Sequence, residues 1–349
     1  MAARPEVDVA GAPVAAIDVL GLAGAFAAAL ARTALRLPWR GPASPFRNIA
    51  VATTRESVRS LMGYMTSLPI DEFRALEQAL DEVSRLVLPP FVKAQGVAMT
   101  SGEVGDVPGL WFRRPGHEPT ATIVYLHGGG YIGTSPSMYA VFMAHLARIT
   151  GCEVFVADYR LAPEFPYPAA TEDVVAVLRG LTSAGIASER LIIAGDSGGG
   201  GLAGSVLHYC NLNGVEIPAA VVLFSPEVSL VLNEPSIREN AALDVLPWNI
   251  PTNPYLHGFD PQDPAVSILH QDLSKWPPTF LSYGGDEVMR DALRTFATRL
   301  TEAGIPSETH EVPDMFHVFP FLLPWTEESQ TVYRQIHRFL ESAVPGFES

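Results

Sequence analysis

Basic residues are scarce in this chain, and lysine is almost absent. The 349 residues contain 23 Lys and Arg against 38 Asp and Glu, so the formal net charge is −15 at pH 7. Only Lys93 and Lys275 are lysines, which we attribute to genomic composition bias. Neutralising a phosphate backbone requires clustered Lys and Arg. The deficit therefore argues against a nucleic-acid partner.

Cysteine is also rare. Cys152 and Cys210 are the only two, and both flank or lie inside predicted core elements. This pattern favours buried free thiols over a disulfide, which fits a reducing compartment and a cytoplasmic location. No cluster of His and Cys has zinc-site spacing, so we expect no metal ion. We expect no cofactor either, because the glycine-rich segment at 127–130 lacks the spacing of a nucleotide-binding fingerprint.

A long uncharged hydrophobic run is missing as well. The run at 19–31 is too short to span a bilayer. Arg4 is the only basic residue before it, so the basic segment of a signal peptide is absent. Two interpretations remain for this run. We favour a cap helix packed over the functional site, and the alternative is an amphipathic helix resting on a membrane surface.

Up to about residue 105 the pattern is helical, with no strong strand. Between residues 70 and 88 the apolar residues recur at spacings of three and four: Phe73, Leu76, Leu80, Val83 and Leu86. This spacing predicts a helix with one apolar face. The two prolines at 89 and 90 are expected to end it.

After about residue 105 short apolar runs alternate with helical patterns. Strands are expected at 110–113, 121–126, 153–157, 191–194, 219–224, 279–283 and 308–312. This alternation predicts an α/β fold with a mostly parallel sheet covered by helices on both faces. We divide the chain into a helical cap and lead-in segment (1–105) and one α/β domain (106–349). The aperiodic segment 230–269, rich in Pro and Asn, is expected to be an excursion near the site.

The most informative motif is Gly195-Asp196-Ser197-Gly198-Gly199. It follows an apolar run (191–194) and precedes a helix-like segment (200–211). A strand, a serine between glycines and a helix are typical of the nucleophile elbow of α/β-hydrolases. The tight turn requires very small residues two positions before and after the serine, here Gly195 and Gly199. Ser197 is therefore the candidate nucleophile.

A second motif, His127-Gly128-Gly129-Gly130-Tyr131, comes directly after the expected strand at 121–126. Acyl transfer passes through an oxyanion, and backbone N–H groups aimed at that oxygen stabilise it. Consecutive glycines allow a loop to turn its amides into a site. We expect Gly129 and Gly130 to donate from this loop, together with the amide of Gly198 after the nucleophile.

These two motifs, with the run Asp158-Tyr159-Arg160-Leu161-Ala162-Pro163-Glu164 between them, resemble the hormone-sensitive-lipase family of carboxylesterases. The resemblance extends from about residue 110 to 317. It implies an α/β-hydrolase fold with a helical N-terminal cap, and cleavage of short-to-medium acyl esters, a small-molecule substrate, without a cofactor. It also implies pairing of two copies through a sheet edge.

The chain departs from the family pattern at three places. Gly198 stands where alanine is usual, and Val318 stands where glycine usually follows the histidine. The Ser-Pro-x-x-Asp segment of the family is Ser225-Pro226-Glu227-Val228-Ser229 here. An acidic contact from the last position of that segment is therefore not expected.

The remaining triad members follow from chain order, which is Ser, then Asp or Glu, then His in this fold. His317, after the expected strand at 308–312, is the candidate base. In the family the acid lies four residues before a second aspartate, here Asp291, and thirteen before the Leu of a Leu-x-x-x-Gly helix end, here Leu300. Both distances select Glu287 and miss the neighbouring Asp286 by one residue. Asp286 stays open as the alternative acid.

Two other functions remain open. Lactones, amides and formamides are hydrolysed by the same machinery, which makes a lactonase or an amide or formamide hydrolase the nearest alternative. A ligand-binding relative without turnover is a second class, but His317 and a full candidate triad argue against it. No feature of the sequence indicates acyl-chain length, alcohol preference or stereoselectivity.

Overall fold

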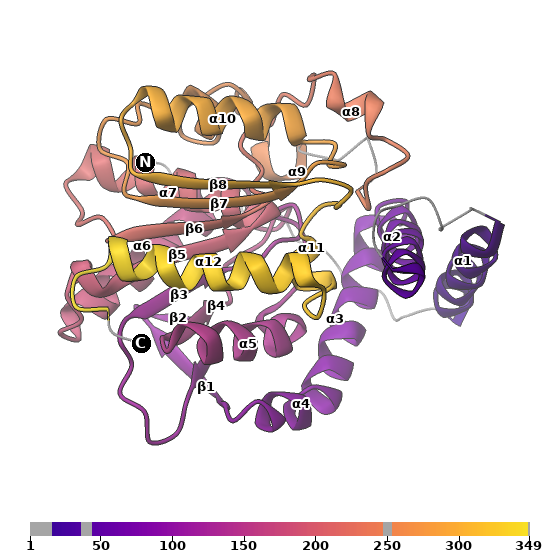
Figure 1. The fold of residues 1–349 in the computed structure, drawn as a ribbon, viewed down its shortest axis with the longest axis horizontal. Coiled ribbons are helices and arrows are strands. Elements are labelled where there is room, and N and C mark those ends of the chain that lie inside the picture. Colours follow the sequence, from indigo (N-terminus) through magenta and orange to yellow (C-terminus); the bar gives the residue numbers. More distant parts are fainter. Residues whose placement is uncertain (1–15, 36–43, 247–252, 348–349) are drawn as a thin grey trace.

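The computed structural model describes residues 16–35, 44–246 and 253–347. Its centre is an eight-stranded sheet in the order β1-β2-β4-β3-β5-β6-β7-β8 (Figure 1). β2 pairs antiparallel with both β1 and β4, and the other neighbours pair parallel. The strands are β1 (Ala98–Val104), β2 (Val107–Arg113), β3 (Thr122–Leu126), β4 (Glu153–Ala157), β5 (Leu191–Asp196), β6 (Ala220–Phe224), β7 (Thr279–Gly284) and β8 (Ser307–Val312). The predicted mostly parallel sheet is confirmed.

Helices cover both faces of this sheet, as expected. One face carries α5 (Ala140–Thr150) and α12 (Glu327–Ala343), and the other carries α6 (Ala169–Ser183), α7 (Ser197–Asn213) and α10 (Arg290–Glu302) (Figure 1). Every residue of β3, β5, β6 and β7 is buried. Parallel strands covered on two sides need such continuous apolar runs, which is why these strands could be predicted from the sequence.

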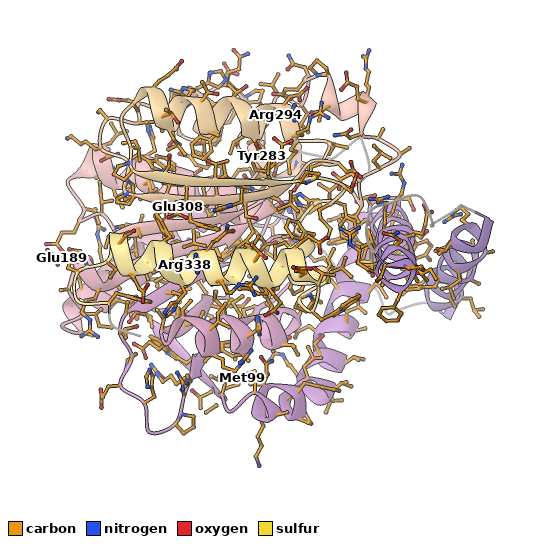
Figure 2. All side chains as sticks on the ribbon, viewed as in Figure 1. Met99, Glu189, Tyr283, Arg294, Glu308 and Arg338 are labelled. Carbon is orange, nitrogen blue, oxygen red and sulfur yellow. The ribbon has the colours of Figure 1, made fainter. Side chains whose placement is uncertain are left out.

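Helix α10 is fastened to the edge of the sheet by a shared carboxylate. Tyr283 of β7 and Arg294 of α10, both labelled in Figure 2, each bind Glu311 of β8. The Tyr283 hydroxyl donates at 3.1 Å, and Arg294 donates from two nitrogens at 2.8 and 2.6 Å. Such a two-pronged guanidinium contact fixes orientation as well as distance.

The N-terminal helices are α1 (Ala16–Leu35), α2 (Pro45–Met65), α3 (Ile70–Val87) and α4 (Pro89–Ala94). In Figure 1, α1 and α2 stand beside the core at the right, and α3 runs between them and the sheet. In α3, Phe73 and Leu76 are buried, whereas Val83 and Leu86 are 55% and 80% exposed. The predicted apolar face is therefore buried only in the first half of the helix. Within the described ranges no helix is long and apolar enough to cross a membrane.

One expectation for this region is wrong, and one is confirmed with an addition. A strand does precede residue 105: β1 pairs with β2 over seven residue pairs. None of its side chains is buried, because an edge strand is held by its backbone hydrogen bonds, so the sequence shows no apolar alternation there. The two prolines end α3, but α4 begins at once at Pro89, since proline is tolerated in the first turn of a helix.

The segment 230–269 follows β6 and contains only short helices, α8 (Ser236–Glu239), α9 (Asn253–Leu256) and a single 3-10 turn that starts at Ile268. Part of it (247–252) lies outside the described residues, as do residues 1–15 and 36–43 of the predicted cap and lead-in segment.

Cys152 and Cys210 are free and buried, as expected. The last short helix, α11 (Phe319–Leu322), follows the His317 loop.

Candidate active site

Ser197 lies at the junction of β5 and α7 with its backbone in the left-handed region, at φ 51°. A side chain on Gly199 would place its Cβ 2.1 Å from the carbonyl oxygen of Leu126, and one on Gly195 would lie 2.7 Å from the oxygen of Gly199. Neither approach is possible for a larger residue. The two glycines are what allow this strained turn to present the serine at the carboxyl end of the sheet.

The glycine loop after β3 faces the first turn of α7. A Cβ on Gly198 would lie 3.1 Å from the backbone nitrogens of Gly130 and Tyr131, so the two segments are in contact. Gly129 and Gly130 have φ values of 113° and 61°. Within the described chain neither of their N–H groups donates a hydrogen bond. The N–H groups of a first helical turn, to which Gly198 belongs, also lack partners inside the helix.

Asp196 ties the elbow to the glycine loop. Its carboxylate accepts from the N–H of Gly128 at 3.0 Å and from the hydroxyls of Tyr125 and Tyr139 at 2.9 Å each. Burial raises the pKa of Asp196 to about 6, although these hydrogen bonds favour the ionised form. Together with a second bond from the Gly128 N–H to the Tyr139 hydroxyl at 3.0 Å, this contact fixes where the loop leaves β3, and so where the next two amides lie.

His317 and Glu287 form a buried pair. The Nδ1 of His317 lies 3.0 Å from Oε2 of Glu287, and the two side chains are 3% and 0% exposed. Burial by itself lowers the pKa of His317, but the hydrogen bond and the charge of Glu287 outweigh it, so the net shift is upward. The Nε2 of His317 has no hydrogen-bond partner within the described residues. The imidazole is therefore held on one side and free on the other.

Asp286 points to different partners. Its carboxylate pairs with Arg55 of α2 at 3.0 Å, and Arg55 also donates to the carbonyl oxygen of Asp314 at 3.4 Å. The two neighbouring carboxylates thus have different partners: Glu287 contacts His317, and Asp286 contacts helix α2 of the N-terminal region. The family spacing selected the residue that contacts His317.

Two residues that the sequence did not single out hold the pair in place. The Ser225 hydroxyl donates to Oε1 of Glu287 at 2.6 Å and accepts from the N–H of Val318 at 3.0 Å. Asp244 accepts from the N–H groups of His317 and Val288 at 2.9 and 2.8 Å. Ser225 stood in a recognised motif and could have been found, but Asp244 comes from the aperiodic segment, where no pattern marks it.

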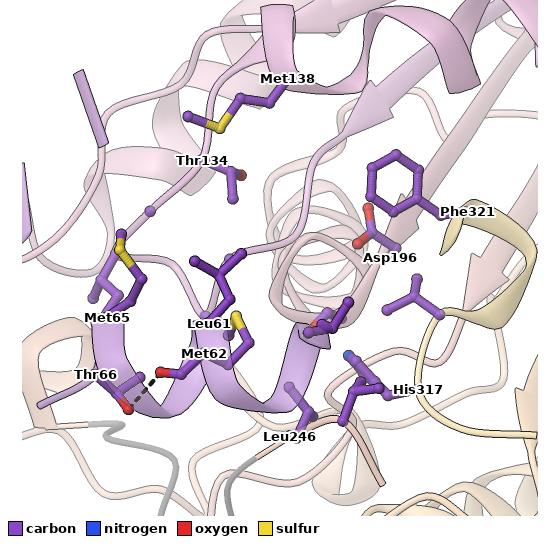
Figure 3. Close-up of a pocket in the computed structure, with 18 of the residues that line it drawn as sticks. Leu61, Met62, Met65, Thr66, Thr134, Met138, Asp196, Leu246, His317 and Phe321 are labelled. Atoms are coloured by element: carbon purple, nitrogen blue, oxygen red, sulfur yellow. Dashed lines mark hydrogen bonds between the residues drawn. The ribbon is translucent and has the colours of Figure 1, made fainter. Parts of the chain in front are cut away.

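Ser197, His317 and Glu227 line one cavity of about 310 Å³. Most of the wall is apolar, and much of it comes from α2 (Figure 3). Figure 3 shows Leu61, Met62 and Met65 on that helix, with Leu246 and His317 across the cavity. An apolar wall with a few polar groups at one point is the usual form of a small-molecule site. In the described ranges no group of three or more His, Cys, Asp or Glu side chains could hold a metal ion.

A nucleophile elbow, a glycine loop with free amides and a buried His–carboxylate pair, all at the carboxyl ends of one parallel sheet, define a hydrolase of the α/β class. Comparison with known proteins supports this directly. A family profile described as alpha/beta hydrolase fold matches residues 123–321. An acetyl-hydrolase of Streptomyces hygroscopicus is 34% identical over 274 residues, which cover 77% of this chain and 89% of that protein.

Comparison with solved structures indicates which family within this class the chain belongs to. A crystal structure of an esterase from the bacterial hormone-sensitive lipase family aligns with a TM-score of 0.69 and 30% identity, over 93% of this chain and 98% of that one. An esterase/lipase from an uncultured bacterium aligns with a TM-score of 0.75 and 28% identity, over 87% and 99%. The chain belongs to the hormone-sensitive-lipase branch of the α/β-hydrolase family.

Proposed function

We propose that this α/β-hydrolase is a serine carboxylesterase that cleaves short-to-medium acyl esters through an acyl-enzyme intermediate. In this proposal Ser197 is the nucleophile, His317 the base and Glu287 the acid. The observation that carries it is the buried Glu287–His317 hydrogen bond, with the opposite ring nitrogen unpaired beside the cavity that Ser197 lines. The names of the relatives, acetyl-hydrolase and esterase, agree with ester cleavage.

The chemistry follows from these positions. Nε2 of His317 takes the proton from the Ser197 hydroxyl, whose oxygen attacks the ester carbonyl carbon. The amides of Gly129, Gly130 and Gly198 stabilise the oxyanion. The C–O bond to the alcohol breaks, and the alcohol leaves with the proton from His317. Water then attacks the acyl carbon and gives a proton to His317. The bond to Ser197 Oγ breaks, His317 returns the proton to that oxygen, and the carboxylic acid is released. Glu287 keeps the imidazole oriented and stabilises its charged form.

The direct test combines active-site labelling with turnover. We expect a fluorophosphonate to label Ser197 and an acyl-chain series of p-nitrophenyl esters to be hydrolysed, with Ser197→Ala abolishing both while the fold is retained. Full turnover by that variant would refute the assignment. Lactones, amides and aryl formamides belong in the same screen, since a preference for one of them would replace ester hydrolysis by the alternative chemistry. Failure to label Ser197 would indicate a ligand-binding relative.

We also propose that residues 1–105 act as cap and lead-in to the catalytic region 106–349. The lining of the cavity by α2 and α3 supports this division. The pairing of β1 with β2 joins the end of the lead-in to the sheet. Exchanging the lining residues of α2 is expected to change chain-length preference without abolishing turnover on acetyl esters.

We further propose that the protein contacts a membrane surface through α1, forms a homodimer and is located in the cytoplasm. Leu20, Phe26 and Leu30 of α1 are 71%, 39% and 55% exposed, which supports contact of this helix with a membrane surface. Co-sedimentation with anionic vesicles, lost in a Leu20→Ser/Leu30→Ser variant, tests it. A homodimer paired through a sheet edge, which the resemblance to the family implies, is tested by analytical ultracentrifugation. The two buried free thiols support a cytoplasmic location, which cell fractionation tests.

A further inference from the structure

Glu227 is a buried carboxylate at the nucleophile that the proposed reaction does not use. It follows β6, and its N–H donates to the carbonyl oxygen of Ser197 at 2.8 Å. The residue is 3% exposed, and it lines the same cavity as Ser197 and His317. It is therefore held against the elbow by its own backbone, with its carboxyl group at the wall of the cavity.

One oxygen of the Glu227 carboxyl has no hydrogen-bond partner in the part of the chain that the structure describes. This oxygen, Oε1, is buried. The other acidic residues of the cavity have hydrogen-bond donors: Asp196 accepts from three, and Oε2 of Glu77 pairs with Arg74 at 2.7 Å, although its Oε1 makes no hydrogen bond within the described residues. Leaving a buried polar atom without a hydrogen-bond partner is unfavourable. Such a cost is expected where a ligand supplies the missing hydrogen bond.

The surroundings indicate which ligand group fits. Burial raises the pKa of Glu227 to about 7, against the opposing influence of nearby His317. The phenols of Tyr131 and Tyr255 are the other titratable groups whose charge is coupled to it. Near neutral pH the carboxyl is present in both forms. A hydroxyl is the group that suits both, because it donates to a carboxylate and accepts from a carboxylic acid.

We propose that Glu227 is a specificity-determining residue that hydrogen-bonds a hydroxyl group of the ester substrate. This inference rests on the proposed esterase function. In this proposal the cavity has two parts. The apolar wall from α2 receives the hydrocarbon of the substrate, and Glu227 binds a hydroxyl close to the ester group. The preferred substrates are then hydroxy-acyl esters or esters of a diol, not simple fatty acyl esters.

Matched ester pairs that exchange a hydroxyl for a methyl group test this. For the acyl side the pair is ethyl 3-hydroxybutanoate and ethyl 3-methylbutanoate, and for the alcohol side it is 2-hydroxyethyl and propyl butanoate. We expect kcat/KM to favour the hydroxyl member of one pair by about tenfold or more, mainly through KM, as one hydrogen bond to a buried carboxyl allows. The pair that shows the preference identifies the side of the substrate.

Two variants connect that preference to Glu227. Glu227→Met should abolish or invert it, whereas Glu227→Gln, which still accepts a hydrogen bond, should keep part of it. Met138→Leu, a change of shape in the same cavity, should alter both members of a pair equally. If kcat/KM does not favour the hydroxyl member in either pair for the wild-type enzyme, or if the preference is unchanged in Glu227→Met, the inference is overturned while the esterase function stands. Absence of any Ser197-dependent ester hydrolysis would instead be a failure of the proposed function.

Discussion

The N–H of Gly128 donates a 3.0 Å hydrogen bond to the carboxylate of Asp196, which directly precedes the nucleophile. Two loops that are far apart in the sequence are joined at this point. One presents the proposed nucleophile, and the other presents the proposed oxyanion donors. Oxyanion stabilisation requires donors that are in position before the charge develops, so a buried acceptor at the root of the loop has a catalytic consequence.

Asp196→Asn should therefore lower kcat by up to about tenfold, because the amide oxygen still accepts from Gly128 but loses the charge, and a charged acceptor adds about 1 kcal/mol to such a bond. KM should change little, since Asp196 is only one small part of the cavity wall. Steady-state kinetics on a p-nitrophenyl ester measures both. Tyr125→Phe is the matched control: it removes one donor from Asp196 without touching Gly128, so a smaller loss is expected. An Asp196→Asn enzyme with wild-type kcat would show that the loop is positioned without this contact.

The pH dependence of turnover should follow His317. The hydrogen bond and charge of Glu287 outweigh burial and raise the pKa of His317 above its usual value of 6.5. A base acts only in its neutral form, so kcat/KM should rise with pH through that raised pKa. Glu287→Gln removes the charge. It should move the acid limb to lower pH, while turnover falls by about 10³–10⁴-fold from loss of the correct tautomer.

Asp286→Asn is the control for that experiment. Asp286 lies one residue away but contacts Arg55 rather than the imidazole. The acid limb should keep its position and kcat should stay within a few-fold of wild type. If Asp286→Asn instead shifted the limb and Glu287→Gln did not, the acid would be assigned to the wrong residue.

Much of this site could be inferred from the sequence because its motifs are local. The turn around Ser197 and the loop at Gly129 both depend on glycines at fixed positions, and β4 agrees with the predicted strand residue for residue. Contacts between distant segments could not be inferred in this way. Asp244 binds the backbone at His317 and Val288, yet it lies in a segment without periodicity. β1 was missed because its side chains are not buried.

The contact between Arg55 and Asp286 joins α2 to the loop that carries Glu287. Their side chains are 17% and 20% exposed, so water still reaches the pair, and we expect it to contribute about 1 kcal/mol to the free energy of unfolding, the upper end of the range for exposed pairs. A double-mutant cycle with Arg55→Ala and Asp286→Asn, followed by urea denaturation, measures this coupling. A coupling above about 2 kcal/mol would contradict the prediction and indicate that the pair is effectively buried.

At Val318 a glycine replacement should give a more stable protein than an alanine replacement, the reverse of the usual order. It is a β-branched residue with φ 53°, and it is 8% exposed. The left-handed conformation costs a residue with a Cβ about 1–2 kcal/mol, and glycine avoids that cost. Val318→Gly should therefore unfold at a higher temperature than Val318→Ala. At Val83, exposed on helix α3, alanine should be the more stable of the two. The usual order at both sites would show that Val318 is not strained.

The buried carboxyl of Glu227 should make stability fall with rising pH, independently of any substrate. Burial raises the pKa of Glu227 from 4.5 to about 7 in the folded protein, so the folded state holds this proton more tightly than the unfolded chain. The contribution is fully present below pH 4.5 and is lost as the pH rises to about 7, by about 3 kcal/mol at most. His317, Tyr131 and Tyr255 face this carboxyl and are unchanged in Glu227→Gln. Urea denaturation should show the unfolding free energy of Glu227→Gln increasing relative to wild type across this range. A constant difference between the two proteins from pH 4.5 to 8 would mean that Glu227 titrates normally, and that its carboxyl is better solvated than the cavity allows.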